Sequence, residues 1–189
     1  FTFIGFCAFS KAIAIYFMPS KSMDQSPHEN PFGNMKYAWQ DRSFGYVLLT
    51  WFIMGFANLW TLPLRVDYVT SPQWGIEGSA IFVAMIITVI PETMRMLLIP
   101  FWARLFDKMN FVILRMILNL SFAAGVLLFF ISSNPWIIGA GSALIGVAFA
   151  GGSIAWNLWV TKYAPPGKTG AYMSVHVSLT GIRGTLGPM

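Results

Sequence analysis

The residues of this chain that could do chemistry are charges placed inside long apolar segments. Glu92 and Arg95 stand three residues apart in one such segment, a spacing that puts both side chains on one face of a helix. Counted from Gly78 at about 1.5 Å per residue, Glu92 lies about 21 Å along the segment, slightly past the middle of a ~30 Å hydrocarbon layer. Charges at that depth are costly and face a partner or a cavity. Two interpretations stay open: a structural ion pair, or a group that binds a solute or carries a proton.

Arg183 has a comparable place in the last apolar segment. It lies between Gly181 and Gly184, whose missing side chains would let another backbone or a ligand approach. The guanidinium could bind an anion or pair with Glu92 across a bundle, and the sequence does not choose between these roles. Three further side chains inside apolar segments complete the candidates for a solute or proton path: Asn119, Asn58 and Trp60.

Other chemistries lack the residues they need. His28 and His176 have no second ligand at metal spacing, so we expect no metal site. The Gly167-Lys168-Thr169 run is not a phosphate loop, because Lys162 stands where the loop needs its first glycine. No nucleophile stands beside a base, and Cys7 is a single cysteine without a disulfide partner. We therefore expect neither an enzyme nor a cofactor.

The composition indicates that a membrane positions these charges. Only 10% of the 189 residues are charged and 56% are hydrophobic, whereas soluble domains carry ~25% charged residues. The apolar residues come in blocks of about 20 or more, the length that crosses a bilayer as a helix. The net charge of +5 is scattered over short connections, which argues against a nucleic-acid-binding face.

The pattern along the chain predicts an all-α fold, a polytopic bundle of transmembrane helices. Residues 1–18 read as the end of one membrane helix, residues 19–43 as a cytoplasmic loop, and residues 44–189 as a bundle of about five spans. Both ends of the chain fall inside apolar segments, so we expect a longer intact protein. The five segments predicted to be spans are 44–64, 78–102, 111–131, 135–161 and 169 onward.

The connections between the segments predict the orientation. Eight Lys and Arg residues fall in the loops on one side, against at most Arg65 on the other. Because cytoplasmic loops retain positive charge, the loop 19–43 and the connections 104–110 and 162–168 are expected to face the cytoplasm.

The connection over residues 103–110 carries the most informative motif. It reads ARLFDKMN and resembles the loop signature of the major facilitator superfamily, as it occurs between the eighth and ninth helices of those transporters. Leu105, Asp107 and Lys108 match the signature. Two positions depart from it, because the family prefers glycine where this chain has Ala103 and Asn110.

Two further stretches carry the same resemblance in the expected order. Residues 30–70 contain NPFGN, DRSFGYVL and LPLRVDYVT and look like the central loop and seventh helix. Residues 162–188 look like the cytoplasmic turn and eleventh helix of bacterial members. The resemblance implies half of a 12-helix fold, from the end of helix six to helix eleven, with the N-terminal half missing from this chain.

The resemblance also implies a function. It implies a secondary active transporter that moves a small solute by alternating access, with coupling to H⁺ or Na⁺ and the lipid bilayer as its surroundings. We expect a multi-pass protein of a cell membrane, specifically a bacterial inner membrane. A second hypothesis is an integral-membrane enzyme or a receptor-like sensor domain. The motif implies a cytoplasmic gate formed by Arg104, Asp107, Lys108 and Arg115.

The predicted orientation can be tested by labelling single cysteines in a Cys7→Ser background of the intact protein. Cysteines at Gln73 and Ser133 are expected to react from outside, and cysteines at Asp107 and Gly167 from the cytoplasm, because the basic loops stay inside. The measurement is modification by a membrane-impermeant maleimide in whole cells and in inverted vesicles. Labelling of Gln73→Cys in inverted vesicles alone would overturn the assignment.

Overall fold

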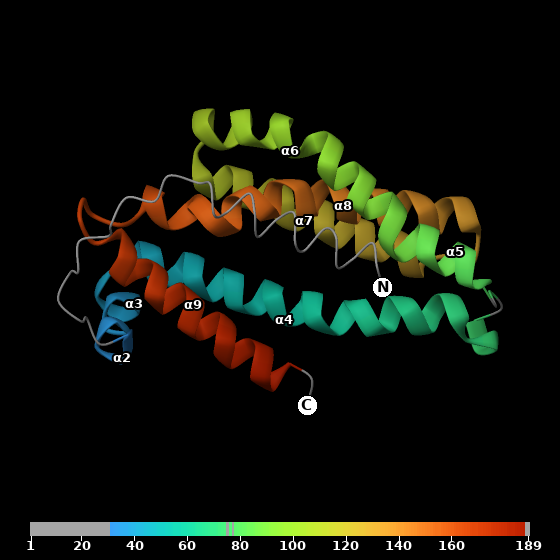
Figure 1. The fold of residues 1–189 in the computed structure, drawn as a ribbon, viewed down its shortest axis with the longest axis horizontal. Coiled ribbons are helices and arrows are strands. Elements are labelled where there is room, and N and C mark those ends of the chain that lie inside the picture. Colours follow the sequence, from blue (N-terminus) through green and yellow to red (C-terminus); the bar gives the residue numbers. More distant parts are fainter. Residues whose placement is uncertain (1–30, 75, 77, 188–189) are drawn as a thin grey trace, which may run out of the picture.

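The computed structural model describes residues 31–74, 76 and 78–187. The predicted helix end over 1–18 and the first part of the predicted loop, 19–30, lie outside the described residues, and so do Cys7 and His28. Figure 1 shows the described chain as a bundle of long helices without strands in its described part. The predicted all-α class is therefore confirmed.

The helices follow one another with short connections. Four of them are long and apolar enough to cross a membrane, and they span Arg42–Thr70, Ala80–Lys108, Phe111–Phe130 and Pro135–Lys162. The remaining predicted span, from Thr169, is also helical but is not among these four. The elements in chain order are α2 (Pro31–Asn34), α3 (Tyr37–Gln40), α4 (Arg42–Thr70), η1 (Pro72–Trp74), α5 (Ala80–Ala84), η2 (Met85–Val89), α6 (Ile90–Lys108), α7 (Phe111–Phe130), α8 (Pro135–Leu158), η3 (Trp159–Lys162) and α9 (Thr169–Leu186).

Short polar side chains begin the long helices. Asp41 accepts a hydrogen bond from the Phe44 N–H at the start of α4, and Asn110 accepts one from Val112 at the start of α7. Asn134 does the same for α8, which continues with Pro135. Such caps satisfy amide groups that have no partner within the helix, so the polar punctuation seen in the sequence marks the helix boundaries.

Helix α8 lies between α6 and α7, and α4 and α9 pack on the other side of the bundle (Figure 1). Small residues allow α8 to approach its neighbours closely. A Cβ atom added at Gly141 would come within 2.6 Å of the Phe129 amide nitrogen and 2.8 Å of the Gly125 carbonyl oxygen, both on α7. Close backbone approach of this kind is how helices associate in lipid, where no hydrophobic effect drives them together.

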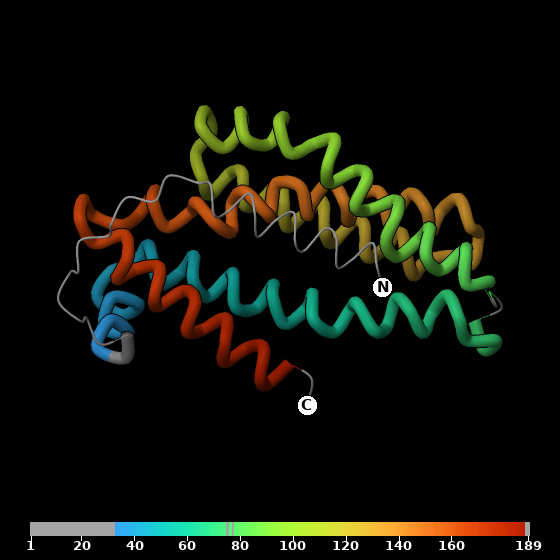
Figure 2. Tube along the Cα trace, viewed as in Figure 1, coloured from blue at the N-terminus to red at the C-terminus, as the bar shows by residue number. Residues whose placement is uncertain are grey.

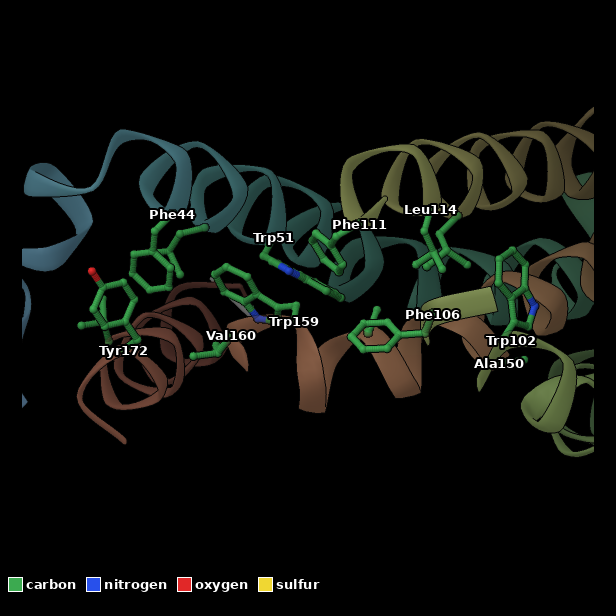
Figure 3. Close-up of a cluster of buried hydrophobic side chains, with 14 residues drawn as sticks. Phe44, Trp51, Trp102, Phe106, Phe111, Leu114, Ala150, Trp159, Val160 and Tyr172 are labelled. Carbon is green, nitrogen blue, oxygen red and sulfur yellow. The ribbon is translucent and has the colours of Figure 1, made fainter. Parts of the chain in front are cut away.

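An aromatic cluster closes the end of the bundle that we expect at the cytoplasm (Figure 3). Phe44 of α4 stacks on Trp159 at 5.1 Å between ring centroids and meets Tyr172 of α9 edge-on at 4.6 Å. Phe111 of α7 also stacks on Trp159, at 6.2 Å. Burial, and next the nearby Asp41 carboxylate, raise the pKa of Tyr163, which packs against this cluster.

The long helix Ala80–Lys108 is bent, as the tube in Figure 2 shows. It contains the π-helical turn η2, in which the Ile90 N–H bonds to the Met85 carbonyl. The next π-type bond would join residue 91 to the Ile86 carbonyl, but Pro91 has no N–H to donate. The Ser142 hydroxyl of α8 donates to the Ile86 carbonyl instead. Ser142 thus satisfies a backbone group that α6 cannot satisfy itself, as the bilayer interior requires.

Replacing this hydroxyl is expected to destabilise the bundle. Ser142→Ala would leave the Ile86 carbonyl without its partner, and an unsatisfied buried acceptor costs about 1–3 kcal/mol. Ser153→Ala is the matched control. The Ser153 hydroxyl donates a 2.8 Å hydrogen bond to the Ala150 carbonyl of its own helix, so its loss breaks no contact between helices. Thermal denaturation of the purified intact protein in detergent measures both. Equal melting temperatures for the two variants would contradict the assigned role of Ser142.

Candidate functional site

A cavity of about 480 Å³ lies between α4, α6, α7, α8 and α9. This volume is in the range of sites that enclose a small molecule. Apolar side chains form the larger part of the wall, and seven polar or charged side chains reach it as well. These are Asn58, Arg95, Arg115, Asn119, Ser153, Asn157 and Arg183.

Arg115 is the most deeply buried charge of the cavity. Its side chain comes from the first turns of α7, and the residue is only 6% exposed. The guanidinium lies 3.5 Å from the centroid of the Trp51 ring on α4, a cation–π contact. Its Nε and Nη2 groups have no hydrogen-bond partner among the described residues. A ring face attracts the charge but does not satisfy these donors.

Arg183 reaches the cavity from α9 and is held in place by α4. Its Nη1 donates a hydrogen bond of 3.1 Å to the Trp51 carbonyl oxygen, and its guanidinium lies 5.3 Å from the centroid of the Trp156 ring. Gly55 makes this position possible, because a Cβ atom there would collide with the Arg183 guanidinium. No ion pair joins Arg183 to Glu92 within the described part of the chain.

Glu92 pairs with Arg95, which the spacing of three residues places on the same helix face. The Arg95 Nη1 lies 3.2 Å from the Glu92 Oε1, and the two side chains are 41% and 43% exposed, respectively. Arg95 is on the wall of the cavity, whereas Glu92 is not. The pair therefore places one neutralised cation at the edge of the site.

The other predicted path residues divide between the cavity and its surroundings. Asn58 and Asn119 are on the wall, and the Oδ1 of Asn119 has no described partner. Trp60 is not on the wall. Its indole N–H donates a 3.0 Å hydrogen bond to the Gly187 carbonyl oxygen, which connects α4 to the end of α9. The Trp60 residue is 60% exposed.

The four residues of the predicted gate do not lie together. Arg104, Asp107 and Lys108 are exposed in the last two turns of α6 and form no ion pair with described residues. Arg115 follows in the sequence but is buried in the cavity. Arg115 lies one helical turn after Phe111, and its side chain contacts Trp51 instead of pointing toward the connection.

Two tryptophans of the site, Trp51 and Trp156, were not among the predicted path residues. Trp51 and Trp156 meet edge-on at 5.1 Å, and the buried His176 ring lies 4.3 Å from Trp156. Helical spacing could have identified Trp51, because it precedes Asn58 by seven residues and so shares its helix face. In the same way, Arg115 precedes Asn119 by four residues, which places Arg115 on the face of a predicted path residue.

Two other features of the described residues bear on the chemistry. No three His, Cys, Asp or Glu side chains gather there in a way that could hold a metal ion. A second hollow of about 680 Å³ runs along α3, α4 and α9, with Arg42 as the charged residue on its wall and mostly apolar side chains elsewhere. The smaller cavity is therefore the better candidate for binding a polar solute.

Four long apolar helices beside a cavity of solute size are those of an α-helical, multi-pass membrane protein. The family model of the Major Facilitator Superfamily matches residues 1–188. The chain therefore belongs to the Major Facilitator Superfamily, whose members are transporters rather than enzymes. No curated protein and no solved structure gives a significant match. The resemblance drawn from the loop motif, the seventh helix and the eleventh helix is confirmed.

The pairing of Glu92 can be tested by double-mutant cycles. Glu92→Gln and Arg95→Gln are expected to couple by about 0.5–3 kcal/mol, because each single change strands the partner charge. Glu92→Gln and Arg183→Gln serve as the matched cycle and are expected to be additive, since Arg183 bonds to the Trp51 carbonyl instead. Melting temperatures of the purified intact protein give both cycles. Stronger coupling of Glu92 to Arg183 than to Arg95 would refute this pairing.

Proposed function

We propose that this chain is the C-terminal half of a secondary active transporter that moves a small solute across a membrane by alternating access. The observation that carries the proposal is the cavity between α4, α6, α7, α8 and α9, with three arginines on its wall. Ionisable groups inside membrane helices face a solute pathway or one another. In secondary transporters the binding site lies inside the bundle, and two halves rock around it.

The remaining parts of the proposal follow from where the other charges lie. The N-terminal half would close the cavity, with the exposed Arg104, Asp107 and Lys108 as the cytoplasmic gate against it. In this proposal Glu92 couples transport to H⁺ or Na⁺, because its carboxylate forms an ion pair with Arg95 on the cavity wall. The membrane would be a bacterial inner membrane. No observation on the described residues favours the alternative of an integral-membrane enzyme or a receptor-like sensor.

Alternating access can be tested with a cysteine at Gly152. This residue is on the cavity wall, and a Cβ atom added there meets nothing within 4 Å, so the substitution should fit. In the intact protein with Cys7→Ser, Gly152→Cys is expected to react with impermeant methanethiosulfonates added from either side of the membrane. Reaction rates are measured in right-side-out and inverted vesicles.

Gly170→Cys is the matched control. A Cβ atom at Gly170 also meets nothing within 4 Å, but the residue lies in the first turn of α9, beside the connection expected at the cytoplasm. It is expected to react from the cytoplasmic side only. Reaction of Gly152→Cys from one side alone would contradict alternating access.

A further inference from the structure

We propose that the cavity selects a small organic anion, whose carboxylate or phosphate group binds Arg115 and Arg183. This inference rests on the proposed transport function, because it names the class of solute. It is carried by the charges on the cavity wall, by the burial of Arg115 and by the unpaired donors of both arginines.

The described carboxylates do not balance the cavity arginines. Three guanidinium groups reach the wall, and Glu92 neutralises only that of Arg95. Asp41 caps α4, and Asp67 accepts a 2.6 Å hydrogen bond from the Ser71 hydroxyl. Asp107 is exposed near the end of α6 and forms no described ion pair. Two positive charges on the wall are therefore without a counter-charge among the described residues.

The missing counter-charge matters most for Arg115, because this residue is buried. Arg115 is 6% exposed, and a cation held away from water and without a counter-charge is strongly unfavourable. The Trp51 ring offsets part of that cost, but Nε and Nη2 still lack acceptors in the described structure. An anion at this point would supply both the missing negative charge and the missing acceptors, and two oxygens of one carboxylate or phosphate match a guanidinium in a paired geometry.

Arg183 supplies the second contact, and it is held ready for one. Its Nη1 is occupied by the Trp51 carbonyl and its guanidinium packs on Gly55 and Trp156. Its Nε is buried without a described partner. A side chain fixed in this way loses little freedom when a ligand arrives, which favours binding. Because Trp51 touches both arginines, one residue of α4 sets the positions of both charges.

The rest of the wall fits the organic part of such a solute. Phe122, Phe149 and Trp156 present apolar surface, and Asn58 and Asn119 offer neutral polar groups. The volume of about 480 Å³ suits a small molecule. A cation would meet two unbalanced guanidinium groups, and a neutral solute would leave them unpaired.

The charge of the cavity can be measured before any natural solute is identified. The intact protein with Cys7→Ser and Gly152→Cys is reacted with an anionic sulfonatoethyl and with a cationic trimethylammonioethyl methanethiosulfonate. The two rates are each divided by the rate with 2-mercaptoethanol in solution. We expect the normalised rate of the anionic reagent to be at least tenfold higher, because the two unbalanced charges act within a cavity whose protein walls have a low dielectric constant. Equal normalised rates, or a faster cationic reagent, would overturn the proposal.

Arginine variants identify the source of the preference. Arg115→Gln and Arg183→Gln are each expected to reduce it severalfold, and Arg115→Lys to retain most of it, because Lys keeps the charge. Arg65→Gln is the matched control, since Arg65 is a buried arginine of α4 that is not on the cavity wall. Size-exclusion profiles report folding, and Arg115→Met, which removes the charge but keeps a long side chain against the Trp51 ring, carries the comparison if Arg115→Gln does not fold. An unchanged preference in Arg183→Gln and in a folded Arg115 variant without the charge would refute the roles of these residues.

Protection of Gly152→Cys from modification tests the ligand class. Benzoate and inorganic phosphate at millimolar concentration are compared with benzamide and benzamidine, which match benzoate in shape but are neutral and cationic. Protection by benzoate alone assigns a carboxylate, and protection by phosphate alone assigns a phosphate group. Protection by neither anion, or equal protection by benzamide or benzamidine, would overturn the proposal. Reaction of Gly152→Cys from both sides without charge preference would leave the transport function standing, whereas reaction from one side would remove that function itself.

Discussion

The contact between Arg115 and the Trp51 ring is the interaction on which the site depends. A guanidinium 6% exposed in a membrane bundle needs a surface that accepts positive charge, and Trp51 supplies it at 3.5 Å. The same Trp51 accepts the Arg183 hydrogen bond through its carbonyl oxygen and meets Trp156 with its ring. Helices α4, α7, α8 and α9 are therefore brought to one point by a single residue, and the cavity forms around it.

Close contacts also hold α6, α7 and α8 together beside this site. Gly125 and Gly141 bring α7 and α8 together, and Ser142 fastens α8 to the π-helical turn before α6. These contacts hold three helices as one layer, while α4 and α9 meet them through aromatic side chains at the end expected at the cytoplasm (Figure 3). The cavity lies where the tightly packed layer faces the aromatic contacts.

The sequence predicted the helices well, because bilayer thickness demands long apolar runs and polar caps such as Asn110 and Asn134 mark their ends. It also placed Glu92 and Arg95 on one helix face, which depends only on spacing within one helix, and left open whether the two charges pair. It could not choose a partner for Arg183, because that depends on how α9 crosses α4. The loop motif assigned Arg115 to the gate, whereas the direction of its side chain places it in the cavity.

The bend of Ala80–Lys108 has a mechanical consequence. Because Pro91 offers no amide to the Ile86 carbonyl, flexing the helix at this point breaks one backbone bond fewer than flexing it elsewhere. The bond that replaces it comes from Ser142, so the pivot is shared by two helices. We therefore expect a bend at this point to be restrained by α8, the helix that presents Gly152 and Trp156 to the cavity.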